Sequence, residues 1–176
     1  MSQGLLQNAA SAAPSVRRRL ACFVYEGVLL FGVVAIAGLL YSVFTQQRHA
    51  LTGAPGMRAF LFIVLGVYFV YFWSRSGQTL AMLTWHIRVV TRTGQPLSAT
   101  RAGARYLLSW LWFLPALASV HFAGLKTAWP VVGALLVGVL TYAALSRLHP
   151  QRQFWHDAVC GTQLITRLPP AKAKKS

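Results

Sequence analysis

Hydrophobic residues in this chain gather into four long stretches that are separated by shorter, more polar segments. The stretches cover residues 20–44, 59–73, 107–125 and 129–145. A helix needs about 20 predominantly apolar residues to cross a bilayer core of about 30 Å. The pattern therefore predicts four membrane-spanning helices, and the two shorter ones gain length from flanking Arg side chains that snorkel to the interface.

The loop between the second and third stretches contains three predicted elements. Residues 77–83 have the composition of a short interfacial helix. Residues 85–90 alternate in polarity and are rich in β-branched side chains, which is typical of a strand. Ser98 can cap the N-terminus of a helix that begins at Ala99 and continues into the third stretch.

The segment after the fourth stretch repeats this pairing of a short helix with a strand. Residues 153–160 place apolar side chains on part of a helical turn, and Gly161 suits the end of such a helix. Two isolated strands are only marginally stable in water, so we expect residues 87–90 and 163–165 to associate. The predicted fold is an all-α membrane protein with four transmembrane helices and a small cytoplasmic layer of interfacial helices and strands.

The distribution of Arg and Lys predicts the orientation. The two ends of the chain and the loop 74–106 carry 14 of the 17 Lys and Arg residues, and the other two loops carry 3. Loops rich in Lys and Arg face the cytoplasm. We therefore expect a multi-pass membrane protein whose two termini are both cytoplasmic.

Composition supports the membrane prediction. The chain has 176 residues, of which 56% are hydrophobic and 11% are charged, whereas a soluble domain averages about 25% charged residues. Glu26 and Asp157 are the only acidic side chains, which excludes EF-hand calcium sites and carboxylate-rich di-iron sites. The net charge of +15 also suits nucleic-acid binding, but the basic residues follow the loop alternation. We expect them to contact anionic lipid headgroups and no nucleic acid.

Side chains that carry catalysis or bind metals form no recognisable motif. The five His residues include no metal-binding i,i+4 pair, and Cys22 and Cys160 are too few and too far apart for a zinc motif. A P-loop, a c-type haem motif and a nucleophile elbow are also missing from the sequence. We therefore expect no catalytic activity, no metal and no cofactor.

Two features of the later stretches bear on helix packing. Pro115 lacks the N–H that a continuous helix needs, and it predicts a kink that frees a carbonyl near Leu111. Ala134 and Gly138 place small residues one turn apart. Small residues at this spacing let helices approach closely, either within the monomer or at a dimer face.

Three short patterns occur in order along the chain. They are RRLACFVYE at residues 18–26, GQTL at 77–80 followed by IRVV at 87–90, and His156-Asp157 before Gly161. Together they resemble the RDD family of small bacterial membrane proteins, over residues 16–167. The resemblance implies a location in the bacterial cytoplasmic (inner) membrane. Residues 1–15 are then expected to form a disordered N-terminal tail, and residues 168–176 a basic C-terminal tail.

The family is named for one Arg and two Asp. Arg19 matches the Arg, and Asp157 matches the second Asp. Glu26 stands where the first Asp normally lies, which keeps the charge and lengthens the side chain by one methylene. Some members of the family have been proposed to be cation/proton antiporters, and the resemblance extends that expectation to this chain.

Glu26 is the sharpest candidate for chemistry. It lies two turns into the first stretch, so it must be protonated, paired, or in contact with a wet cavity. A tunable pKa suits proton or cation coupling, whereas pairing with Arg suits a structural clamp. We predict that Glu26 and Asp157 each pair with an Arg and that Arg19 belongs to the same charged cluster. The candidate partners are Arg75, Arg101, Arg105 and Arg152.

The scarcity of polar residues in the four stretches bears on function, because it leaves little lining for a polar pathway. We therefore expect a non-catalytic accessory or assembly subunit of a larger membrane complex, which contacts other membrane subunits or a second copy of itself. The alternative is a small proton- or monovalent-cation-coupled transporter that uses Glu26. Polar residues facing one mid-membrane cavity favour the transporter, and a dry interior favours the accessory role.

Overall fold

The computed structural model describes residues 13–45, 54–125, 127–148 and 153–167. Its three longest helices are α2 (Val16–Phe44), α3 (Ala54–Arg75) and α7 (Ala128–Leu145). Within the described ranges, these three are the helices long and apolar enough to cross a membrane. For α7 the candidate span includes the following turn and ends at Leu148. The predicted tails lie outside the described residues, except for residues 13–15, where Ser15 caps α2 by accepting the Arg18 N–H.

The third hydrophobic stretch is not one continuous helix. Helix α5 (Ala99–Ser109) ends before a 3-10 turn, η1 (Trp110–Trp112), and a separate short helix, α6 (Leu114–Phe122), follows. Pro115 lies in the first turn of α6, where its missing N–H leaves no bond to break. The prediction of a single helix over 107–125 is therefore wrong, and the expected count of four spanning helices is not confirmed.

Helices α6 and α7 pack closely against each other at a glycine. A Cβ atom placed on Gly138 would lie 2.9 Å from the Cβ of Ala116, which is too close for any larger residue without movement. The small-residue spacing found in the sequence is thus used, at Gly138, for packing within the chain. The contact holds α6 and α7 together as a hairpin.

The two predicted strands associate as expected. Strand β1 (Ile87–Thr91) pairs antiparallel with β2 (Thr162–Thr166), with Val89 opposite Leu164. The short helix α8 (Trp155–Cys160) leads into β2 through Gly161, whose φ of 65° is the left-handed conformation that ends helices and favours glycine. These contacts join segments of the chain that are about 75 positions apart.

Side-chain caps fix where the other helices begin. Helix α4 (Leu80–Thr84) starts three residues later than predicted, because the Thr79 side chain caps it by accepting the Met82 N–H. Ser98 caps α5 by accepting the Arg101 N–H, which confirms the predicted start at Ala99. A second 3-10 turn, η2 (Ser146–Leu148), follows α7.

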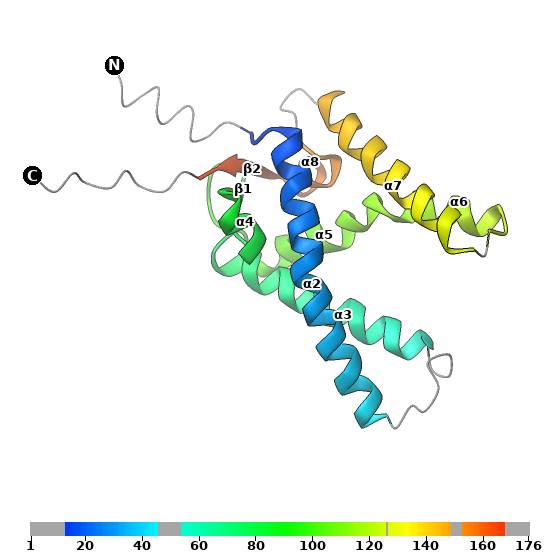
Figure 1. Ribbon diagram of the computed structural model, residues 1–176. Coiled ribbons are helices and arrows are strands. Elements are labelled where there is room, and N and C mark those ends of the chain that lie inside the picture. Colours follow the sequence, from blue (N-terminus) through cyan, green and yellow to red (C-terminus); the bar gives the residue numbers. More distant parts are fainter. Residues whose placement is uncertain (1–12, 46–53, 126, 149–152, 168–176) are drawn as a thin grey trace, which may run out of the picture.

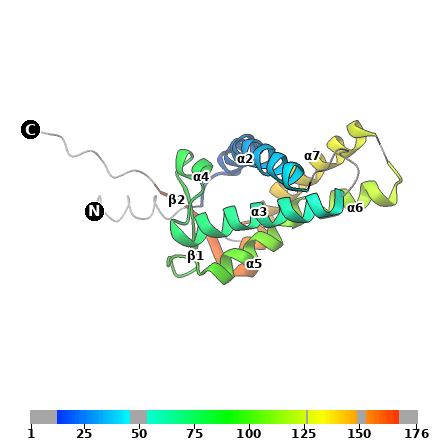
Figure 2. The ribbon, with the colours of Figure 1, turned by 90° about the horizontal axis from the view of Figure 1, so that it is seen from below.

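The buried core lies at one end of the molecule. The β1–β2 pair and α4 lie at that end, and the α6–α7 hairpin reaches out at the opposite end (Figures 1 and 2). Ile87 and Val89 of β1 pack with Ala102 of α5 and Cys22 of α2. By contrast, in the most apolar 18-residue segment of each of the three long helices, only 6% of the residues are buried. The short elements therefore hold the fold together, while the long helices present their apolar side chains outward.

Candidate functional site: a charged cluster at the end of a cavity

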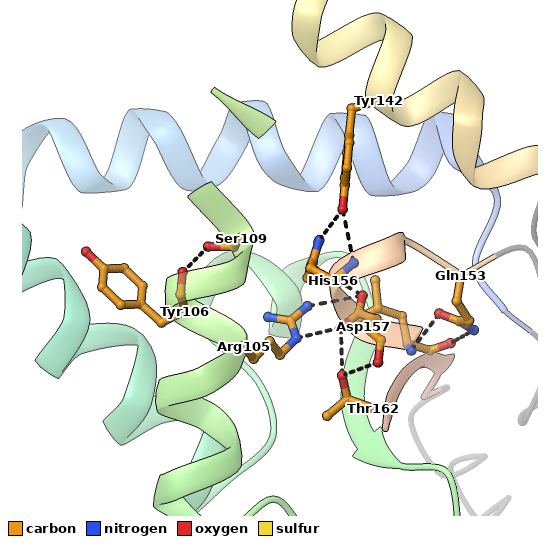
Figure 3. Close-up of polar contacts among 9 residues, drawn as sticks. Arg105, Tyr106, Ser109, Tyr142, Gln153, His156, Asp157 and Thr162 are labelled. Carbon is orange, nitrogen blue, oxygen red and sulfur yellow. Dashed lines mark hydrogen bonds and ion pairs between the residues drawn. The ribbon is translucent and has the colours of Figure 1, made fainter. Parts of the chain in front are cut away.

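Asp157 and Arg105 form a buried ion pair between α8 and α5. The Arg105 Nε atom donates to Asp157 Oδ1 at 2.7 Å, and its Nη2 atom donates to Oδ2 at 3.5 Å (Figure 3). The Thr162 hydroxyl donates a further bond of 2.9 Å to Oδ1. Asp157 is fully buried and Arg105 is 5% exposed. The Arg that pairs with Asp157 is therefore Arg105.

Charge around this pair keeps Asp157 ionised. Burial acts to raise the pKa of Asp157, but the Arg105 guanidinium, His156 and the hydrogen bonds from Arg105 and Thr162 together outweigh that effect, so the pKa lies below its usual value. The guanidinium carbon of Arg105 also lies 4.0 Å from the centre of the Trp73 ring, a cation–π contact that fixes the side chain from its other face. The pair thus joins α5 to α8, and Arg105 also contacts α3 through Trp73.

His156 is held beside the ion pair by Tyr142. The Tyr142 hydroxyl accepts the backbone N–H of His156 at 3.0 Å and lies 3.0 Å from the ring Nδ1 (Figure 3). The other ring nitrogen, Nε2, is 3.5 Å from Asp157 Oδ2. Burial lowers the pKa of His156 to about 4. A neutral ring fits these contacts, with the Nε2 hydrogen directed at Asp157 and Nδ1 accepting from Tyr142.

Glu26 is bound by hydroxyl groups. Its Oε1 accepts from the Tyr68 hydroxyl at 2.8 Å, and its Oε2 accepts from the Thr79 hydroxyl. Within the ranges that the structure describes, no Arg or Lys forms an ion pair with it. Among the described residues, the predicted Arg partner of Glu26 is therefore not found. The reason is local: α3 and the start of α4 pack against α2 and bring hydroxyls to the carboxylate.

Arg19 lies apart from both carboxylate contacts. It is 4% exposed, and its guanidinium carbon stands 4.4 Å from the centre of the Phe154 ring. Its Nε and Nη1 atoms have no hydrogen-bond partner among the described residues. Arg19, Glu26 and Asp157 therefore do not form one ion-paired cluster. Each of the three has different contacts.

Arg18 makes contacts that the sequence did not reveal. Its Nε donates to the Trp85 carbonyl at 2.7 Å, its Nη2 to the His86 carbonyl at 2.8 Å, and its Nη1 to the Thr166 hydroxyl at 3.4 Å. One side chain thus joins the start of α2 to the two residues that precede β1 and to the last residue of β2. Adjacent arginines at 17–19 gave no signal to single it out.

The remaining candidate partners, Arg75, Arg101 and Arg152, are not found in an ion pair among the described residues. Arg75 and Arg101 are exposed, and neither forms an ion pair in the described part of the chain. Arg152 lies outside the described residues. Within those residues no group of three or more His, Cys, Asp or Glu side chains is placed to hold a metal ion.

Arg19, Glu26, Arg105 and His156 all border one cavity of about 570 Å³. The rest of the wall is almost entirely apolar and aromatic, including Phe23, Trp112 and Leu135. A ligand in the cavity would meet the Glu26 carboxylate and the Arg19 guanidinium, which has no ion-pair partner in the described part of the chain. It offers no nucleophile paired with a base.

These features define a small helical membrane protein in which a two-stranded sheet and an internal Arg–Asp pair join the two halves of the chain. The sequence model of the RDD family matches residues 13–161. The chain therefore belongs to the RDD family, as the sequence patterns indicated. Searches of curated proteins and of solved structures found no match to the chain.

Proposed function

We propose that this protein is a non-catalytic accessory or assembly subunit of a larger complex in the bacterial inner membrane. The observation that carries the proposal is the exposure of the three long helices. In the most apolar segment of each, only 6% of the residues are buried. Helices with so few internal contacts leave apolar faces available to other membrane proteins. Association in a membrane depends on close packing at such faces.

The use of the charged residues supports the same proposal. Arg18 binds two backbone carbonyls and one hydroxyl, and Arg105 binds Asp157. These side chains fasten the short elements to α2 and α5, so they serve the internal architecture. A packed core at one end of three exposed helices suits a subunit whose helices are covered by other proteins of a complex.

Photo-crosslinking in intact membranes tests the accessory role. A photoreactive amino acid is placed at Ile36 of α2, Val67 of α3 or Val137 of α7, which are 64%, 65% and 64% exposed. Val159 of α8, which is 70% exposed and outside the spanning helices, reports background reaction. We expect at least one spanning position to give a discrete adduct with a different membrane protein. Adducts with lipid alone, or with a second copy alone, would contradict the proposal.

A second candidate, a proton- or monovalent-cation-coupled transporter, is favoured by the surroundings of Glu26. The residue is 8% exposed and borders the cavity, and two hydroxyls donate to its carboxylate. Such a group can take up a proton without breaking an ion pair. The candidate ranks second because the Arg19 guanidinium borders the same cavity and repels cations.

Reconstitution in liposomes tests the transporter. If Glu26 carries protons, Glu26→Gln should fold normally and abolish proton-coupled cation flux. Tyr68→Phe, which keeps the carboxylate and removes one hydroxyl donor, should shift the pH dependence of flux and leave flux itself present. Flux that persists in Glu26→Gln, or its absence in the unaltered protein, rules this candidate out.

A further inference from the structure

The cavity bordered by Arg19 has one charged end and a long apolar interior. On α2 its wall runs from Arg19 to Leu30. These eleven steps correspond to roughly 16 Å along the helix axis. The apolar lining includes Leu30 of α2, Leu117 of α6 and Leu135 of α7. Its volume of about 570 Å³ lies in the range of ligand pockets, roughly 300–1,000 Å³.

Among the residues that the structure describes, no counter-ion bonds to the Arg19 side chain. Asp157 is close enough to attract the guanidinium electrostatically, but its oxygens are bonded to Arg105 and Thr162. Both oxygens of Glu26 accept from hydroxyls. Two buried Arg19 nitrogens thus remain without a hydrogen bond among the described residues. Leaving a buried guanidinium unsatisfied is strongly unfavourable, so an anion from outside the chain fits this position.

We propose that the cavity binds an anionic membrane lipid, with the headgroup phosphate at Arg19 and one acyl chain along α2. Charge and shape both support this occupant. The charged end lies in the first turn of a spanning helix, where lipid headgroups lie, and the apolar part extends into the membrane-spanning region. The proposal goes beyond the accessory and transport roles and depends on neither.

The binding experiment uses the full-length protein in detergent and native mass spectrometry. The probes are phosphatidylglycerol, phosphatidylcholine with the same acyl chains, and inorganic phosphate. We expect one phosphatidylglycerol per chain, retained about tenfold or more over phosphatidylcholine, because the choline ammonium neutralises the phosphate of the second lipid and is repelled by the Arg19 guanidinium. Equal retention of the two lipids would overturn the proposal. Binding of inorganic phosphate that competes fully with the lipid would show an anion site without a lipid tail, and would overturn it too.

Two pairs of variants separate the headgroup contact from the acyl-chain contact. Arg19→Gln should abolish the preference for the anionic lipid, whereas Arg17→Gln, an exposed site on the same helix, should keep it. Gly27→Leu fills the cavity from its wall, because a Cβ there meets no other atom within 4 Å. Gly32→Leu makes the same change on α2 outside the cavity.

Both leucine variants improve helix propensity, so loss of folding is not expected from either. We expect Gly27→Leu to reduce lipid retention about tenfold and Gly32→Leu to leave it unchanged, since only the first displaces methylene groups from the wall. If Gly27→Leu retains phosphatidylglycerol as the unaltered protein does, the acyl chain does not lie in the cavity. That result overturns the proposal even where Arg19→Gln is too unstable to purify.

Discussion

The Arg105 Nε atom lies 2.7 Å from Asp157 Oδ1, although 52 positions separate the two residues in the chain. The pair is buried on both sides and shared between α5 and α8. Because each charge neutralises the other in a buried setting, neither can be removed alone without leaving an unpaired ion.

Removing the Arg105 charge should therefore unfold the protein more easily. We expect Arg105→Gln to lower the free energy of unfolding by about 3–5 kcal/mol, the range for breaking one partner of a buried pair. Arg101→Gln removes the same charge one turn earlier on α5, at an exposed position, and should change the free energy of unfolding by less than about 0.5 kcal/mol. Unfolding in detergent measures both. Equal effects of the two substitutions would contradict the structural role of the pair.

Acid should destabilise the protein through His156 and Asp157. The pKa of His156 is lowered from 6.5 to about 4, so between these pH values the unfolded chain binds the proton and the folded chain does not. Stability is therefore lost as pH falls through that window, by up to about 3 kcal/mol. The lowered pKa of Asp157 acts in the same direction at lower pH, below its ordinary value of 3.8.

Unfolding measured from pH 7.5 to pH 4.5 tests the His156 contribution. His156→Gln should flatten the dependence across this window, because the titrating group is gone. His121→Gln, at an exposed position on α6, should keep the full slope. A slope that survives in His156→Gln would assign the acid sensitivity to another group.

Thr79 should matter through its hydroxyl. That hydroxyl donates to Glu26 and accepts the Met82 N–H that begins α4. Thr79→Val keeps the shape and loses both bonds, so we expect a loss of about 2–4 kcal/mol, whereas Thr79→Ser should lose less than about 1 kcal/mol. Thr84→Val, at the exposed end of the same helix, is the matched control. Similar losses in the valine and serine variants at position 79 would count against the hydroxyl bridge.

Labelling can establish which side of the membrane each loop occupies. In a chain carrying Cys22→Ala and Cys160→Ala, single cysteines are placed at Arg17, Arg167 or Gly53. We expect an impermeant maleimide to label Gly53→Cys in intact cells, and Arg17→Cys and Arg167→Cys only after permeabilisation, because the basic segments face the cytoplasm. A label at position 53 that is reached only from inside would reverse this orientation.

Local chemistry explains which parts of the fold could be predicted from the sequence. Ser98 and Gly161 act within one helical turn, so their caps could be anticipated from neighbouring residues. The pairing of β1 with β2 followed from two isolated strand patterns that needed a partner. The break at η1 was only partly predicted, because Pro115 indicated a kink while the turn begins at Trp110.

The charged site was harder to predict, because its partners come from distant elements. Asp157 is ion-paired with Arg105, which the sequence offered only as one of four possible Arg partners for the charged cluster as a whole. Glu26 is bound by the hydroxyls of Tyr68 and Thr79, residue types too common to stand out. The Thr of the GQTL pattern was the one available signal. Its N-cap role gives a reason for a hydroxyl at that position.

The unequal lengths of α2 and α7 have a consequence for the lipid around the protein. Helix α2 has 29 residues and extends about 44 Å, whereas α7 has 18 residues and extends about 27 Å. In a bilayer whose hydrocarbon core is about 30 Å thick, a longer helix tilts. Beside a shorter helix, the bilayer becomes locally thinner. No single bilayer thickness matches the lengths of both helices. The thickness of the membrane therefore affects the tilt of the protein, and it favours neighbouring proteins that reduce this length mismatch.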